Sequence, residues 1–135
     1  MRRVAHRASG RRWSVPVLAT IIATLSVAIT SPAQAAPNVA KAWGFNKDGE
    51  LGNGTIENSN IPVAVNELAG VTAVAGGVRH SLALLENGTL RAWGGNEAGQ
   101  LGNGTTEGST VPVTVSGLSE VAAVSAGKSF SLALL

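Results

Sequence analysis

The chain has 135 residues, a formal net charge of +2 and no cysteine. This length suits one small domain, and the missing cysteine excludes disulfides, thiolate zinc sites and cysteine nucleophiles. Only 4% of the residues are aromatic and tyrosine is absent, which is little for a core that must be stable by itself. The first twelve positions contain five of the ten basic residues: Arg2, Arg3, Arg7, Arg11 and Arg12.

This basic segment is followed by an apolar run, Val15–Ile29, and then by small residues that include Ala33 and Ala35. That order predicts a secretory signal peptide over residues 1–35, cut between Ala35 and Ala36. The alternative is a membrane anchor, but about fifteen helical residues reach only about 22 Å of the ~30 Å hydrocarbon core. We therefore expect a secreted protein, extracellular or at the cell surface and of bacterial origin, with no membrane association after cleavage.

Residues 36–135 contain five basic and eight acidic residues, so their net charge is −3. The overall positive charge thus belongs to the leader. A nucleic-acid-binding protein needs clustered lysine and arginine to displace counterions from phosphates. The five basic residues are spread along the chain, and we therefore exclude nucleic acid as a partner.

Residues 36–135 consist of two copies of one unit with an offset of 50 residues. Ala42-Trp43-Gly44 returns at 92–94, Leu51–Thr55 at 101–105 and Ser81–Leu85 at 131–135. Over residues 39–85, 25 of 47 positions are identical to those 50 residues later. A fixed period of 40–50 residues with strand-forming composition is typical of β-propeller blades.

The strongest local signal is Asn87-Gly88 between two apolar runs, which predicts a β-hairpin with a two-residue type I′ turn. Such a turn would pair Leu85 with Leu90, and Leu82 with Trp93. One face would then carry Leu82, Leu84, Trp93 and the stem of Arg91, and the other Ala83, Leu85, Leu90 and Ala92. Because both faces are apolar, we expect the sheet to be covered on both sides, as a blade is by its neighbours.

Two further strands complete the predicted unit. The first, Val71–Val74 or 121–124, is followed by Gly77 or Gly127, where we expect the close backbone approach of blades that meet at an axis. The second, Ile61–Val65 or 111–115, contains a proline that cannot donate to a ladder, which favours an outer edge. Long connections rich in Gly, Asn and Thr precede this outer strand in both units.

The unit resembles the regulator of chromosome condensation repeat. The residues of that signature are Trp43, Gly44, Leu51, Gly52, Gly54, Gly77 and His80 in the first copy, and Trp93, Gly94, Leu101, Gly102, Gly104 and Gly127 in the second. The resemblance implies an all-β fold, with two blades of a seven-bladed β-propeller. It also implies a distant relation to the type II β-lactamase inhibitor proteins, whose blades are shorter.

Two units depart from that pattern, because a closed propeller has about four to eight blades. Val39–Trp43 matches the second strand of the predicted hairpin and Ser131–Leu135 matches the first, and each lacks its partner strand. We expect a truncated product or a segment of a longer propeller. The alternative is self-association of several chains into one ring through these open edges.

Candidate catalytic and metal sites are few. His80 beside Ser81 suggests a base and a nucleophile, but adjacent strand residues point to opposite faces, and the second copy has Phe130 in place of His80. Asn46–Glu50 resembles a calcium loop, but the second copy has Ala98 and Gln100 in place of the acidic Asp48 and Glu50. Trp43 and Trp93 are expected to pack between blades rather than to hold a ligand. We expect no enzyme activity, no metal and no cofactor.

The function predicted from these observations is non-catalytic binding of an unidentified protein partner. One alternative is inhibition of a secreted enzyme such as a β-lactamase, which rests on shared architecture and export. A second is guanine-nucleotide exchange, the activity of the family's founding member, to which no residue here can be assigned.

Overall fold

The computed structural model describes residues 38–135, and the predicted signal peptide and its cleavage site at Ala35–Ala36 lie outside the described residues. The described part forms eight strands: β1 (Val39–Gly44), β2 (Ser59–Ala69), β3 (Val71–Gly76), β4 (His80–Leu85), β5 (Leu90–Gly94), β6 (Ser109–Thr114), β7 (Ala123–Ala126) and β8 (Ser131–Leu134). All strand pairs are antiparallel. Residues 38–135 contain no helix that could cross a bilayer.

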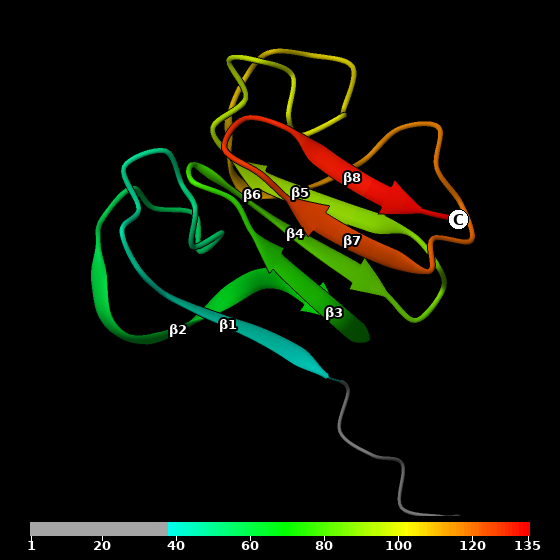
Figure 1. Ribbon diagram of the computed structural model, residues 1–135. Coiled ribbons are helices and arrows are strands. Elements are labelled where there is room, and N and C mark those ends of the chain that lie inside the picture. The colour runs from blue at the N-terminus through cyan, green and yellow to red at the C-terminus, as the bar shows by residue number, and fades with distance from the viewer. Residues whose placement is uncertain (1–37) are drawn as a thin grey trace, which may run out of the picture. The chain divides into compact units, whose positions relative to one another are not determined.

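The strands form one complete four-stranded sheet, in the order β3-β4-β5-β6, and two separate pairs, β1-β2 and β7-β8. Figure 1 shows the complete sheet with the cyan and green β1-β2 pair and the orange and red β7-β8 pair beside it. By the 50-residue offset, β1-β2 is the outer half of a blade and β7-β8 is the inner half of another. This all-β arrangement of blade-like sheets confirms the predicted fold class.

The outer strands lie where the sequence predicted them. Pro112 lies in β6, which is the edge of the four-stranded sheet, and Pro62 lies in β2, which pairs only with β1. The inner strand of the second unit begins later than expected, at Ala123, although the amide of Ala122 donates to the carbonyl of Leu134 at 2.7 Å. Proline at an edge removes no ladder hydrogen bond, because that side of the strand has no neighbour.

The two central strands, β4 and β5, are buried on both faces, as predicted. On one face Leu82, Leu84, Leu90 and Ala92 pack with Leu101 and Val121 of the second unit. On the other face Ala83 and Trp93 pack with Val65 and Leu68 of the first unit. The buried apolar side chains of the complete sheet therefore join it to both half-blades.

The register predicted for the β4-β5 hairpin is wrong by one residue. Leu84 is opposite Leu90, Leu82 is opposite Ala92, and Ser81 is opposite Trp93. Leu90 and Ala92 therefore share a face with Leu82 and Leu84, and Trp93 shares the other face with Ala83.

The cause of this shift is the turn itself. The amide of Gly88 donates to the carbonyl of Leu85 at 2.9 Å, and the amide of Leu85 donates to the carbonyl of Thr89 at 3.0 Å. Gly88 has φ +73°, whereas Asn87 has no positive φ, so the loop is a type I turn followed by a glycine bulge rather than type I′. The Oδ1 atom of Asn87 accepts hydrogen bonds from both the amide and the hydroxyl of Thr89, at 3.1 and 2.6 Å.

Candidate interaction site

The two long connections, residues 45–58 and 95–108, are each organised around one buried asparagine. The Nδ2 atom of Asn46 donates to the carbonyls of Thr55 and Glu57, both at 3.0 Å, and its Oδ1 accepts from the amide of Leu51 at 2.8 Å. Asn96 repeats this pattern in the second unit, with distances of 2.9 Å. The connections have no strand partner for these backbone groups, and the asparagine side chains supply the missing hydrogen bonds.

The two connections are linked by Arg79, which lies in the turn between β3 and β4. Its Nη2 donates to Asp48 Oδ1 at 2.9 Å, and its Nη1 donates to Glu97 Oε2 at 3.3 Å. The hydrogen bond with Asp48 raises the pKa of Arg79. The 77–79 turn precedes β4 and the 95–108 connection follows β5 at the same end of the complete sheet, where His80 is opposite Gly94. The hydrogen bond from Arg79 to Asp48 brings the 45–58 connection to that end. We call these three segments the loop face.

The calcium reading of residues 46–50 does not match this geometry. The Oδ1 of Asn46 already accepts from Leu51, and the carboxylate of Asp48 faces Arg79. The carboxylate of Glu50 accepts from the amide of Asp48 at 2.9 Å. Within residues 38–135 no three histidine, cysteine, aspartate or glutamate side chains gather as a metal site would require.

His80 is fully buried and pairs with Ser131 of the second unit rather than with the adjacent Ser81. Its Nε2 lies 3.0 Å from Ser131 Oγ, and the hydroxyl of Ser131 donates to the carbonyl of Gln100 at 2.7 Å. Since the single hydroxyl hydrogen points to Gln100, Nε2 must carry a proton and donate to Ser131. A protonated Nε2 cannot act as a base toward this hydroxyl, so the pair joins two units and does not form a nucleophile.

Burial also lowers the pKa of His80, because the charged imidazolium would lose its hydration. The other ring nitrogen, Nδ1, is buried and has no hydrogen-bond partner within the part of the chain that the structure describes. A Cβ at Gly77 would lie 2.5 Å from this atom and 2.6 Å from the carbonyl oxygen of Gly127. Gly77 and Gly127 therefore mark a close approach between units, as the sequence predicted, and a side chain at Gly77 would displace the imidazole.

The seam between the β1-β2 half-blade and the complete blade is built around Trp93. Its indole is 3% exposed, and Nε1 donates to the carbonyl of Glu50 at 2.8 Å. The same carbonyl accepts from the hydroxyl of Ser81 at 2.8 Å. A Cβ at Gly52 would lie 2.7 Å from Nε1, so the indole can lie on the backbone of this connection only because residue 52 is glycine.

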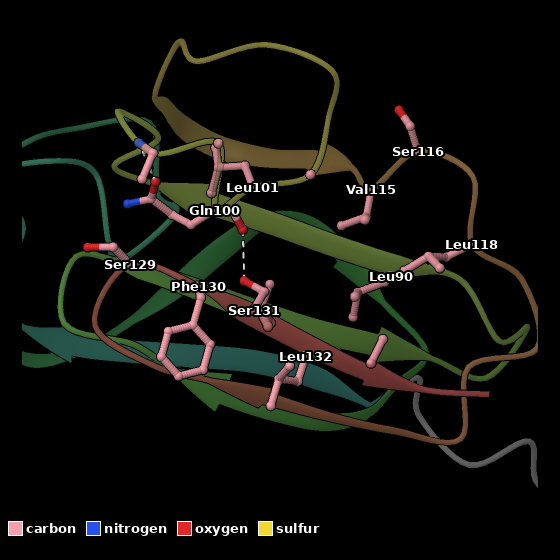
Figure 2. Close-up of a pocket in the computed structure, with 15 residues that line it drawn as sticks. Leu90, Gln100, Leu101, Val115, Ser116, Leu118, Ser129, Phe130, Ser131 and Leu132 are labelled. Atoms are coloured by element: carbon pink, nitrogen blue, oxygen red, sulfur yellow. Dashed lines mark hydrogen bonds between the residues drawn. The ribbon is translucent and has the colours of Figure 1, made fainter.

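The positions 50 residues after those that surround Trp93 line an open pocket of about 440 Å³. It is lined by Gln100, Gly102, Val115, Leu118 and Ala133, which correspond to Glu50, Gly52, Val65, Leu68 and Ala83. Figure 2 shows Gln100, Val115 and Leu118 around the pocket, with Ser131 donating to the carbonyl of Gln100.

Trp43, which corresponds to Trp93, is 65% exposed. Repeat position therefore does not determine burial, and the expectation of packing between blades is met by Trp93 only. The same contrast holds on β8, where Leu132 is 60% exposed although its counterpart Leu82 is 1% exposed. The remaining signature residues, Gly44, Leu51, Gly54, Gly94, Leu101 and Gly104, lie at strand ends and in the connections, and Leu51 and Leu101 are buried.

Comparison with solved structures finds blades of this kind in much longer chains. Human WBSCR16 aligns with 29% identity over 71% of this chain and 26% of its own, with a TM-score of 0.63. Yeast RCC1 (Prp20), solved with bound Kap60, aligns with 27% identity over 71% and 23%, with a TM-score of 0.59. Prp20p from Saccharomyces cerevisiae, in a structure described with its binding properties to Gsp1p and histones, aligns with 22% identity over 74% and 27%, with a TM-score of 0.62.

The chain thus spans about a quarter of the length of these structures. No curated protein matches it. The family model for the regulator of chromosome condensation (RCC1) repeat matches twice in succession, at residues 42–84 and 87–134, and a second model of the same repeat matches residues 71–100. The chain belongs to the regulator of chromosome condensation (RCC1) repeat family.

Proposed function

We propose that this chain is an exported, non-catalytic β-propeller-repeat protein that binds another protein through its loop face. The observation that carries the proposal is the order within that face: Asn46 and Asn96 each fix one long connection, and Arg79 links the two. Loops held by a rigid scaffold present a preformed surface, which lowers the entropic cost of binding. Two solved structures of yeast Prp20 also concern protein partners, namely Gsp1p and histones in one case and Kap60 in the other.

The buried polar groups support a non-catalytic role. The hydroxyls of Ser81 and Ser131 donate to backbone carbonyls, and His80 donates to Ser131. Because of these hydrogen bonds, neither serine hydroxyl is free to act as a nucleophile, and Nε2 of His80 is not free to act as a base. The exposed side chains of the connections, such as Lys47 and Glu57, are instead available to a partner.

Site-specific cross-linking tests the loop face as the binding surface. The chain has no cysteine, so a cysteine introduced as Glu57→Cys is a unique attachment point for a photoreactive group. Glu86→Cys is the matched control, because it removes the same charge from an exposed position at the opposite end of β4. Among proteins exported by the same cells, we expect one defined partner to cross-link from position 57 and not from position 86. Equal labelling from both positions, or no defined product, would refute the loop face as the binding surface.

The alternative functions and export of the chain are tested by separate measurements. Loss of β-lactamase activity on addition of the chain would replace the proposal with an inhibitor function, and faster nucleotide release from a GTPase would replace it with exchange. Export predicts that the secreted protein begins at Ala36 by intact mass, because Ala33 and Ala35 present the small side chains that signal peptidase requires. A secreted chain that retains Val15–Ile29 would contradict that prediction.

A further inference from the structure

The two ends of the described chain are complementary halves of the seam that already exists inside it. In that internal seam the indole of Trp93 fills the space over Gly52 and is surrounded by Val65, Leu68 and Ala83, all of them buried. Fifty residues further on, Gly102 is exposed and Val115 is only half-buried. The pocket therefore has the backbone acceptor and the walls of a tryptophan site, and no indole of residues 38–135 lines it.

The exposed Trp43 is the side chain that fits this pocket. It follows Ala42 and precedes Gly44 on β1, as Trp93 follows Ala92 and precedes Gly94 on β5. β5 places Trp93 opposite Ser81 of β4, and Ser131 of β8 corresponds to Ser81. A β1 strand paired with β8 in the same register would bring Trp43 opposite Ser131 and direct its Nε1 to the carbonyl of Gln100.

A further set of three positions shows complementary changes in size. In the internal seam Gly95 lies against the bulky ion pair, since a Cβ there would lie 3.4 Å from Arg79 Cβ and 3.6 Å from Asp48 Cβ. At the open ends the three corresponding residues are Phe45, Ser129 and Ala98. Ser129 and Ala98 line the pocket, and Phe45 is 59% exposed. At the open ends the large residue, Phe45, is therefore on the inserting strand, and the small residues, Ser129 and Ala98, are on the surface that would receive it.

We propose that the pocket at Gln100 and Gly102 is a docking site for a second copy of this chain, which inserts Trp43 and Phe45 and pairs its β1 with β8. The occupant is identified by the internal seam, which shows the same strand pairing and the same indole site within one chain. This inference goes beyond the proposed function, because its occupant is a second copy of this chain. Its contact uses only part of the loop face, namely Phe45 and the pocket residues of the 95–108 connection.

The proposed contact is heterologous, because the inserting end and the receiving end are different surfaces. Each added copy completes one blade from β7-β8 and the incoming β1-β2, so every copy contributes two blades. Closed rings of three or four copies would have six or eight blades, within the range of known propellers. If the rotation between copies does not close, the same contact produces filaments.

Two substitutions remove the two sides of this contact separately. Trp43→Ala removes the inserting side chain and leaves the pocket intact. Gly102→Ala places a methyl group where the indole would lie, since the equivalent Cβ at Gly52 would be 2.7 Å from Trp93 Nε1. The control is Ile56→Ala, which truncates an exposed apolar residue in the connection without touching the contact.

Sedimentation equilibrium of the 135-residue chain measures the outcome. All variants keep the same leader, so any association through that segment is common to them. We expect the parent and Ile56→Ala to associate. The association constant of Trp43→Ala should be lower by a factor of about 30 or more, as the loss of an aromatic hot spot produces. Gly102→Ala should associate as weakly, so that both variants are monomeric at a concentration where the parent associates.

An equimolar mixture of the two monomeric variants provides the decisive result. The Gly102→Ala chain still offers Trp43, and the Trp43→Ala chain still offers an open pocket, so the mixture should form a 1:1 dimer and nothing larger. That rescue cannot come from a misfolded variant. A monomeric parent, equal association by Trp43→Ala, or no dimer in the mixture of folded variants would overturn the proposal.

Discussion

Two tryptophans at the same repeat position should differ sharply in their effect on stability. Trp93 is 3% exposed, between the complete blade and the first unit, whereas Trp43 is 65% exposed. Truncating a buried tryptophan to alanine removes its transfer free energy and leaves a cavity, together about 3–5 kcal/mol. The carbonyl of Glu50 keeps the hydroxyl of Ser81 as a donor, so loss of the indole N–H does not leave it without a partner. Trp93→Ala should therefore lower the free energy of unfolding by about 3–5 kcal/mol, and Trp43→Ala by no more than about 0.5 kcal/mol.

Urea unfolding followed by far-ultraviolet circular dichroism measures both changes. The protein concentration must be low enough to keep the chain monomeric, so that loss of self-association does not contribute. With a slope of about 2 kcal/mol per molar urea, Trp93→Ala should lower the midpoint by roughly 2 M while Trp43→Ala leaves it unchanged. A Trp93→Ala chain already unfolded without urea is the limiting case of the same result. Equal shifts for the two variants would refute the burial assigned to the seam.

Two further predictions concern the buried polar groups. Burial lowers the pKa of His80, so the unfolded chain binds the extra proton and stability should fall as the pH drops below about 6.5. His80→Phe, which copies Phe130, should remove that decrease in melting temperature between pH 7.5 and 5.5, and an unchanged pH profile would contradict it. Asn96→Ala should lower the free energy of unfolding by about 2–3 kcal/mol, because the amide of Leu101 and two carbonyls lose their hydrogen-bond partner. Limited proteolysis should then cut within residues 95–108 before any other described segment, and uniform cleavage would argue against Asn96 as the anchor of that connection.

Much of the fold follows from periodicity and local chemistry. The 50-residue offset, the proline-containing strands and the apolar β4 run predicted the blade, its outer edge and its burial on both faces. Asn87-Gly88 predicted a hairpin, but it could not distinguish two-residue from three-residue loops. The Thr89 hydroxyl and amide both bind Asn87 Oδ1, and this side-chain contact accompanies the three-residue loop that shifts the register.

The candidate site was less predictable, because its contacts join different units. His80 is adjacent to Ser81 in sequence, yet its partner is Ser131, fifty-one residues away. Repeat alignment assigns Trp43 and Trp93 the same role, yet burial depends on whether a neighbouring unit supplies the equivalent of Gly52. The conspicuous length of the connections was visible in the sequence, whereas the anchoring role of Asn46 and Asn96 depends on carbonyls that only folding brings within reach.

Amide hydrogen exchange of the full chain tests the central claim most directly, namely that one complete blade lies between two half-blades with open edges. At low protein concentration we predict the slowest exchange in β4 and β5, each paired on both sides, and faster exchange in β1 and β8, each paired on one side only. Raising the concentration should protect β1 and β8 together. Protection of β8 equal to that of β4 at low concentration, or rapid exchange throughout β4, would contradict the account.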